Sequence, residues 1–547
     1  MNARAAKRTK GVRAPAAPAL SAAEARAPVP PLWSAGVGLA ALAIYLALAP
    51  PVSADRDTAE FTLVLATLGV AHPTGYPLYT MLGHGFVSLL HAPGATWAFG
   101  ANAWSALGGA VAMAFLHAFA ARLAPPAARS SRRARFVIGL LPVALLGLNA
   151  SWTSETCFAE VYSWHLAWVC GAALYFAWLV RALHARDGEW PARRLHAHAA
   201  GWGFLCGLGG AHHVTAILVA APLSLGLLVA LAALRKLRWT LLPALLAATL
   251  VPLASYGYLY WRAFHPAPVQ WPLLTPSLAS VLQHATGGQY RRFFGHFAPS
   301  VEQQVELARW VYPVLFPGLL LLLVAALLAR GRGGRTLAGS LFAAATIVTL
   351  YGFSYGVADP ASYFLPAMAL GLAALAPPGG ALAAASRGAA RAAGAAFAVL
   401  ALALAWPGIG KGLERRSGFI TYDRLLHSMW MAVPADSGFL LWADDMYYRL
   451  YEYQLLRHEK PRLYVDNPLS LMNAEASARF ARRFGFDPMA GLPPPPFSVG
   501  TFPGDTAMTH YIDEFGQSIN RRTALPVVMF EPQRARFRVL PKASTSP

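Results

Sequence analysis

Long apolar segments separated by short polar ones dominate the chain between residues 33 and 408. Most are close to the ~20 residues that an α-helix needs to cross the hydrocarbon core of a bilayer. Their approximate bounds are 33–51, 98–121, 136–150, 160–180, 197–212, 214–234, 239–261, 310–329, 336–357, 361–378 and 389–408. The pattern predicts an α-helical polytopic membrane protein with about eleven transmembrane helices over residues 32–408.

Arginine and lysine residues gather in every second connection between these segments. This set of connections carries Arg122, Arg129, Arg132, Arg133, Arg135, Arg181, Arg186, Arg193, Arg194, Arg235, Lys236, Arg238, Arg330, Arg332, Arg335, Arg387 and Arg391. The other set has few basic residues and includes a loop at 52–97 and another near 262–309. Because positive residues hold short loops on the cytoplasmic side, the N-terminus should be cytoplasmic and residues 409–547 should lie outside. Omitting either short segment, 136–150 or 197–212, would break the alternation.

The two ends of the chain differ from the apolar middle. Residues 1–31 are rich in Ala, Pro and Arg and predict a disordered, basic cytoplasmic tail. The triplet after the first apolar segment, Val52-Ser53-Ala54, imitates a signal-peptidase site, an alternative that the long leader before it disfavours. From residue 409 the sequence is typical of a water-soluble domain. Two strand-like runs, 438–442 and 462–465, flank a helical stretch at 446–458, so we expect a soluble α/β domain over 409–547.

Composition supports a membrane protein and argues against other classes. Hydrophobic residues make up 56% of the 547 residues and charged residues only 13%, whereas soluble domains carry about 25% charged residues. The net charge is +20, but the excess is dispersed among the short connections and forms no patch for a nucleic acid. The three cysteines lie in or beside apolar segments and suggest neither a disulfide framework nor a zinc site.

The most informative polar stretch follows the first apolar segment. It contains Asp57 and Glu60, and the apolar segment after it, 63–90, is interrupted by His72, Pro73 and Pro77. Carboxylates at the edge of a bilayer are costly unless they are solvated or functional, and solvated loop acids are the simpler alternative. The broken segment predicts an interfacial or re-entrant stretch that holds the two acids where a lipid-linked substrate would meet a polar one.

These residues resemble the signature of a known family. The matching motifs are Asp57-Thr58-Ala59-Glu60 and His72-Pro73-Thr74-Gly75-Tyr76-Pro77-Leu78-Tyr79. They resemble a broadly distributed family of membrane proteins, long catalogued as a domain of unknown function, that includes the eukaryotic transmembrane O-mannosyltransferase acting on plexin-type receptor domains. The family usually has Ser-Gly between the two acids and Pro at position 74, so this chain departs at Thr58, Ala59 and Thr74. Further matching segments are Trp152, 159–162, 207–215, 266–271, 287–290, 359–366, Asp444-Asp445 and Arg462.

The resemblance implies a C-type (GT-C) glycosyltransferase fold, in which a sugar carried on a polyprenyl phosphate is transferred on the outer face of the membrane. In that fold an acid in the first outer loop acts as base, and Asp57 is the matching position. A carboxylate there would take the proton of the acceptor hydroxyl. Direct displacement would invert the anomeric carbon, whereas retention would require a second, nucleophilic carboxylate. Glu60 would share a helix face with Asp57 and is a candidate to orient the acceptor or to hold a divalent cation, although a capping role explains it equally well.

Further residues on the outer side are candidates for substrate binding. They are His72, Tyr76, Glu160, His212, His213, Arg262, Tyr290, Arg291 and Arg292. The guanidinium groups would suit a lipid phosphate, with snorkelling at the interface as the alternative. The aromatic side chains would stack on a sugar or lie in the membrane-interface belt. Glu160 has pairing with an interface amide as its alternative, and the two adjacent histidines are more often structural than metal-binding.

The prediction is therefore a membrane glycosyltransferase that moves a monosaccharide, by analogy mannose, from a polyprenyl-phosphate donor to a protein or glycan acceptor. The basic leader suits a bacterial inner membrane, with the C-terminal domain in the periplasm. A transporter or flippase of lipid-linked sugars is one alternative, but it predicts charges near mid-span and a two-fold repeat, which the sequence lacks. A non-enzymatic membrane anchor for the C-terminal domain is the other, and it leaves Asp57 and His72 unexplained.

Overall fold

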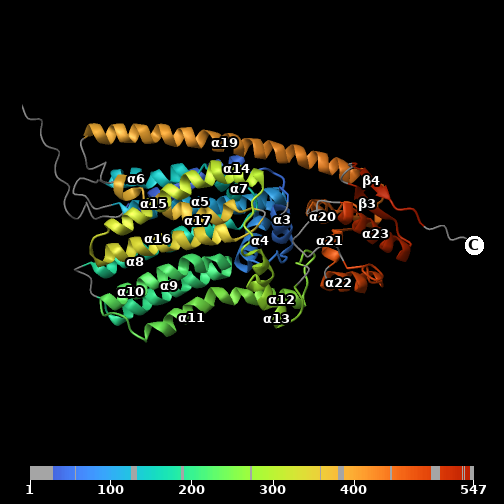
Figure 1. The fold of residues 1–547 in the computed structure, drawn as a ribbon, viewed down its shortest axis with the longest axis horizontal. Helices are drawn as coiled ribbons and strands as arrows, with labels where there is room; N and C mark the ends of the chain where they lie inside the picture. The colour runs from blue at the N-terminus through green and yellow to red at the C-terminus, as the bar shows by residue number, and fades with distance from the viewer. Residues whose placement is uncertain are drawn as a thin grey trace, which may run out of the picture.

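A bundle of long helices and a small α/β domain lie at opposite ends of the molecule (Figure 1). The computed structural model describes residues 29–55, 57–124, 132–185, 190–271, 274–357, 359–379, 387–443, 446–472, 474–494, 506–531, 534 and 536–542. The predicted tail, apart from its last three residues, and the pair Asp444-Asp445 lie outside these ranges.

The bundle confirms the predicted polytopic helical architecture. Its helices are α2 (Pro31–Leu48), α5 (Trp97–Leu123), α6 (Arg132–Leu146), α7 (Ala150–Cys157), α8 (Tyr162–His184), α9 (Ala192–His212), α10 (Ile217–Ala233), α11 (Leu241–Leu253), α12 (Gly257–Phe264), α14 (Val301–Glu306), α15 (Tyr312–Leu328), α16 (Gly331–Ser354) and α17 (Leu365–Ala373). Among the described residues, eight helical segments are long and apolar enough to span a membrane, and the pair α6–α7, bent by 85°, would make a ninth. All eleven predicted segments are helical, including 197–212 within α9 and 389–408 within the long helix α19 (Arg387–Met431).

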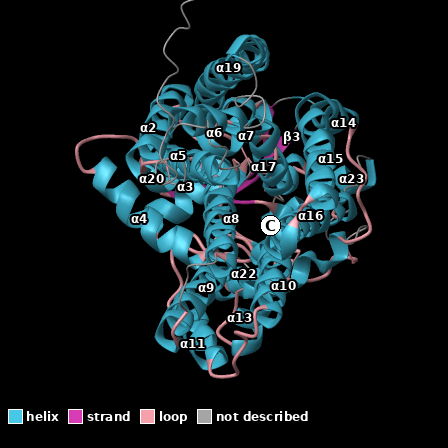
Figure 2. Cartoon of the chain, turned by 90° about the vertical axis from the view of Figure 1, so that its left-hand side faces the viewer, coloured by secondary structure: helices cyan, strands magenta, loops and turns pink. Residues whose placement is uncertain are grey.

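Helix α8 lies near the middle of the bundle and packs against α5, α9, α10, α16 and α17 (Figure 2). Small residues allow the helices to approach closely. A Cβ atom added to Gly371 of α17 would come within 2.7 Å of the Gly318 Cα atom of α15. Close approach of this kind is how membrane helices gain packing energy where no hydrophobic effect drives them together.

Residues 57–91 form two short helices, α3 (Asp57–Thr67) and α4 (Pro77–His91), as the prediction of a broken segment requires. The chain reverses between them through Gly75 and Tyr76, whose φ angles of 76° and 43° are left-handed. Pro77 occupies the first turn of α4, where its missing N–H group costs nothing. Because α3 is buried along most of its length, Asp57 and Glu60 are carried by a fixed element.

The C-terminal domain contains a four-stranded sheet with the order β2-β1-β3-β4. The strands are β1 (Ser437–Leu441), β2 (Arg462–Asp466), β3 (Val527–Glu531) and β4 (Arg536–Val539), and the helices are α20 (Tyr447–Leu456), α21 (Pro468–Leu471), α22 (Ala474–Phe484) and α23 (Thr506–Arg522). Strand β1 is parallel to β2 and β3, whereas β4 is antiparallel to β3. The predicted strand–helix–strand unit is confirmed. Helix α19 continues without a break through residue 409 to Met431, and the first strand of the sheet follows it (Figure 1).

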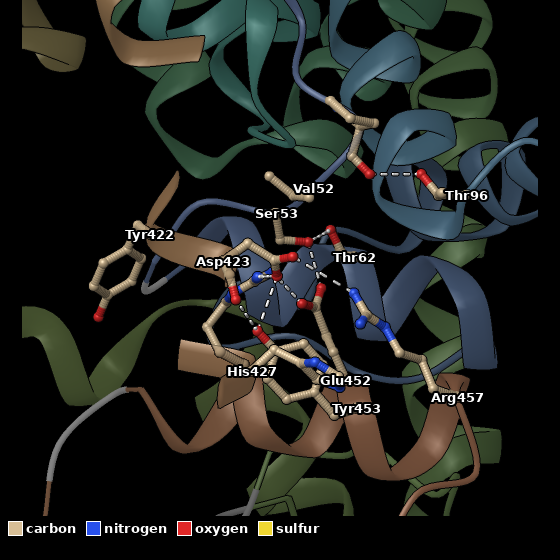
Figure 3. Close-up of polar contacts among 12 residues, drawn as sticks. Val52, Ser53, Thr62, Thr96, Tyr422, Asp423, His427, Glu452, Tyr453 and Arg457 are labelled. Atoms are coloured by element: carbon tan, nitrogen blue, oxygen red, sulfur yellow. Dashed lines mark hydrogen bonds and ion pairs between the residues drawn. The ribbon is translucent and has the colours of Figure 1, made fainter. Parts of the chain in front are cut away.

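A buried ion network joins the C-terminal domain to helix α3 (Figure 3). Arg449 of α20, 2% exposed, pairs with Asp423 of α19 and with Glu452. Glu452 accepts a hydrogen bond from the hydroxyl of Ser53, whose Oγ atom lies 2.8 Å from Thr62 Oγ1 in α3. The network thereby fixes the acid-bearing helix against α20.

Candidate functional site

Asp57, Glu60 and His72 meet at the junction of α3 and the loop that follows it. The His72 Nδ1 atom lies 2.6 Å from Glu60 Oε2, and the His72 backbone N–H group donates to Glu60 Oε1 over 2.8 Å. The other ring nitrogen, Nε2, lies 3.9 Å from Asp57 Oδ2. Both Glu60 oxygens are therefore engaged by His72, and Asp57 lies on the other side of the ring.

Exposure separates the two acids. The Asp57 side chain is 58% exposed and that of Glu60 only 3%. Burial acts to lower the pKa of His72, but the charges of Glu60 and Asp57 outweigh it and raise the pKa to about 9. The raised pKa favours the positively charged form of His72, which Glu60 holds beside the exposed side chain of Asp57.

Aromatic side chains surround the His72 ring. The Tyr76 hydroxyl lies 3.3 Å from His72 Nε2, and the ring of Tyr290 is centred 6.3 Å from the His72 ring. The Trp271 ring is at a similar distance, 6.2 Å. The structure thus brings Tyr76 and Tyr290, both predicted site residues, to the acids, and the three aromatic side chains form a wall on which a sugar ring can pack.

The next group of predicted residues, Glu160, His212 and His213, lies around Tyr76 and the start of α8. The His213 ring is centred 5.7 Å from Tyr76, and the Nε2 atom of His212 lies 3.0 Å from the Val161 carbonyl oxygen. The main chain of Glu160 is held by hydrogen bonds with the Ser105 hydroxyl. Burial raises the pKa of the Glu160 carboxyl well above its usual range, and nearby acids, Asp57 among them, add to the shift. The two histidines therefore support Tyr76 and the start of α8.

The three candidate arginines occupy two places. The guanidinium group of Arg262 lies 4.5 Å from the centre of the Trp261 ring and donates weakly to the His265 carbonyl. Arg291 and Arg292 are exposed on a short 3₁₀ turn, Gly288–Phe293, that also carries Tyr290. The pair therefore follows directly on an aromatic residue of the site, whereas Arg262 is engaged locally.

Sequence reasoning missed a second acidic group. The Ser362 hydroxyl lies 3.0 Å from Glu155 Oε1 and 2.8 Å from Asp359 Oδ2. Glu155 is 2% exposed, and its Oε2 atom has no hydrogen-bond partner. Glu155 and Asp359 both lie in connections with few basic residues, on the predicted outer side, and this placement was the sequence feature that could have drawn attention to them. Because the two acids are far apart in the sequence, their proximity could not be predicted from it.

The first acidic group also has the composition of a cation site. One ligand atom from each of Asp57, Glu60 and His72 lies within 4.8 Å of the others. Carboxylate oxygens and an imidazole nitrogen suit zinc or manganese better than an oxygen-only ion. Since Glu60 holds Nδ1, Asp57 and the Nε2 atom of His72 would bind the ion, with Glu60 orienting the ring.

The part of the chain that carries this site is similar to a known protein domain. Residues 57–236 match the model of the N-terminal domain of the protein O-mannosyl-transferase TMEM260, a range that starts at Asp57 and ends after His213. No curated protein sequence matches the chain significantly.

Two solved structures are similar to the chain in overall fold. One is the archaeal oligosaccharyltransferase AglB from Archaeoglobus fulgidus, in complex with an inhibitory peptide and a dolichol-phosphate. It is 13% identical over 94% of this chain and 75% of that chain, with a TM-score of 0.48. The other is ArnT from Cupriavidus metallidurans bound to undecaprenyl phosphate, 15% identical over 92% of this chain and 93% of that chain, with a TM-score of 0.44. Residues 57–236 of this chain are thus similar to the N-terminal domain of the protein O-mannosyl-transferase TMEM260.

Proposed function

We propose that this protein transfers a monosaccharide, mannose, from a polyprenyl phosphate to a hydroxyl group of a protein or glycan acceptor on the outer face of the membrane. The observation that carries the proposal is the pairing of an exposed carboxylate, Asp57, with the buried His72–Glu60 pair. The family match begins at the same residue, Asp57.

Each residue has a defined part in the proposed reaction. Asp57 accepts the proton of the acceptor hydroxyl while its oxygen attacks the anomeric carbon. The bond between that carbon and the phosphate oxygen breaks, and polyprenyl phosphate leaves with the electron pair, which inverts the anomeric configuration. The positive charge of His72 faces the same space, and Glu60 fixes its ring. A divalent cation held by Asp57 and the neutral form of His72 would supply this positive charge in place of the imidazolium.

A donor panel tests this function. The purified protein in lipid nanodiscs is incubated with radiolabelled polyprenyl-phosphate sugars and a mixture of serine- and threonine-containing peptides and glycans. We expect the parental protein to release label from the mannose donor in the presence of acceptor. The Asp57→Asn variant should leave the same donor intact. Intact donors throughout the panel would exclude the proposed reaction.

The donor phosphate should bind Arg291 and Arg292, the exposed pair beside Tyr290. We expect their joint replacement by Gln to raise the apparent KM for the donor about tenfold, with a smaller change in kcat, because the contact stabilises the bound donor and the transition state alike. Initial-rate measurements over a range of donor concentrations provide the test. An unchanged donor KM in a variant of parental thermal stability would move the phosphate site to Arg262.

The proposed orientation can be tested by cysteine labelling in a Cys206→Ser background. Leu237 lies in a loop between two basic residues, Arg235 and Arg238, and Ala524 lies in the C-terminal domain, both exposed. In intact cells, an impermeant thiol reagent should label Ala524→Cys and should label Leu237→Cys only after lysis. Equal labelling of the two in intact cells would contradict the topology.

A further inference from the structure

A continuous series of polar contacts leads from the C-terminal domain to the first turn of α3. The carboxyl group of Glu452, on α20, meets the Ser53 hydroxyl, and Ser53 Oγ lies 2.8 Å from Thr62 Oγ1 (Figure 3). The Thr62 hydroxyl donates to the carbonyl oxygen of Thr58 over 2.9 Å. Thr58 directly follows Asp57, so the series ends one residue from the proposed catalytic base.

The number of protons along this series depends on the charge of Glu452. Ser53 and Thr62 each carry one hydroxyl proton, and the Thr58 carbonyl only accepts. When Glu452 is ionised, Ser53 donates to it, and one of the three oxygen–oxygen contacts has no proton. When Glu452 is neutral, its own proton completes the series, and every contact is a hydrogen bond directed toward α3. Protonation of Glu452 thus adds one hydrogen bond to the attachment of that helix.

The position of the Glu452 carboxyl group suits the neutral form. Arg449 donates to its Oε2 atom, which leaves Oε1, the oxygen that meets Ser53, to carry the proton. The side chain is buried. Burial raises the pKa of this carboxyl to about 7, although the charge of Arg449 acts to lower it. Both forms of Glu452 are therefore populated near neutral pH.

Charged groups from two helices face Glu452. They are Arg449 and the exposed Arg457 of α20, and Asp423 of α19. Asp423 pairs with Arg449 through the other branch of its guanidinium group and so balances its charge. On the side of α3, Glu452 meets the uncharged hydroxyl of Ser53. Because Asp423 already compensates Arg449, the network keeps its ion pair when Glu452 is neutral.

We propose that Glu452 is a positioning residue for the transfer reaction: its neutral carboxyl group donates toward α3 through Ser53 and Thr62 and so holds Asp57 in its reactive orientation. Ionisation of Glu452 removes one bond of this attachment, so the C-terminal domain makes the rate of transfer depend on pH. The inference rests on the proposed function and deepens it, because it gives the C-terminal domain a part in setting the geometry of the base.

Glu452→Gln separates the effect of the proton from that of the side-chain volume. The amide group donates to Ser53 at every pH, and its oxygen still accepts from Arg449. The neutral carboxyl prevails below its pKa and is lost above it. The ratio of kcat in the variant to kcat in the parental protein should therefore be close to one at about pH 6 and rise to about fivefold at about pH 8.5, with a midpoint near 7. Titration of groups that the two proteins share cancels in this ratio.

Two further variants test the route. Ser53→Ala interrupts the series with little change in volume. It should lower kcat about fivefold at about pH 6, and in its background Glu452→Gln should no longer raise kcat at about pH 8.5. Glu459→Gln is the control, because Glu459 is an acid of the same domain that pairs with His427 over 3.0 Å and lies outside the series. Its kcat ratio to the parental protein should not change with pH.

Hydrogen exchange of the backbone amides of α3 gives a readout that needs no turnover. At about pH 8.5 these amides should exchange about fivefold faster in the parental protein than in Glu452→Gln, because the parental attachment has lost one hydrogen bond. At about pH 6 the two proteins should exchange equally. The amides of α4 should not distinguish them at either pH.

The outcomes separate this inference from the proposed function. The expected difference in exchange without any sugar transfer would contradict the function and leave the pH-dependent attachment of α3 standing. Sugar transfer with a kcat ratio that does not change with pH would overturn the positioning role alone. Equal exchange of α3 in the two proteins at both pH values would also overturn it.

Discussion

Replacement of Asp57 by Asn should lower the rate constant for sugar transfer at saturating substrates by about a hundredfold or more. The amide keeps the shape of the side chain but cannot take a proton from the acceptor hydroxyl. Because Asp57 is 58% exposed and is not buried in the core, the protein should fold normally. Initial rates with the parental donor and acceptor, together with donor binding measured separately, provide the test. Donor binding should survive.

Asp55 provides a matched control for this substitution. It lies two residues earlier in the same connection and has no part in the cluster with His72. Asp55→Asn should therefore leave the rate within about twofold, the range of a neutral surface change. If the Asp57→Asn variant transferred sugar at the parental rate, Asp57 would be a solvated loop acid without a catalytic role.

Replacement of Arg449 by Met should destabilise the C-terminal domain by about 3–5 kcal/mol, the effect of removing one partner from a buried ion network. The substitution leaves the carboxylates of Asp423 and Glu452 without their shared cation in a site where Arg449 is 2% exposed. Hydrogen exchange of the β1 backbone amides should report the loss, since this strand is buried at the centre of the sheet.

Arg457 offers the comparison that tests this reasoning. Its guanidinium group lies 3.7 Å from the same carboxylate, Asp423, but its side chain is 45% exposed. Solvent screens such a pair, so Arg457→Met should cost less than about 1 kcal/mol. Similar protection of β1 in the two variants would show that burial does not set the energy of this network.

The positions of the helices along the chain were predictable, because each apolar segment is recognisable from its own composition and length. A run of about twenty apolar residues forms a helix in a bilayer whatever its neighbours do. The break between α3 and α4 was equally local, since it depends on Pro73, Gly75 and Pro77. The strands β1 and β2 followed from short apolar runs between polar turns. The pairing of Glu60 with His72 was not predicted, although the two lie in neighbouring motifs twelve residues apart.

The boundary of the C-terminal domain depended on more than local composition. The change from apolar to polar residues at 409 does not end α19, because a helix continues for as long as its residues tolerate the helical backbone and one face finds a partner. The late part of α19 packs Leu426 and Trp430 into the core of the C-terminal domain. The sequence alone therefore marked where the chain becomes polar, and the packing decided where the domain begins.

The sequence by itself determined which segments are helices and where the polar motif lies. Only the tertiary structure decided which distant residues share a site. Ser53 meets Glu452 across 399 residues, and Glu155 meets Ser362 across 207. The same packing brings Glu60 and three arginines of α22, Arg479, Arg482 and Arg483, to the lining of one cavity. Such contacts arise when whole elements pack together, and no local periodicity encodes them, because each partner satisfies its own helix or strand in the same way wherever the other lies.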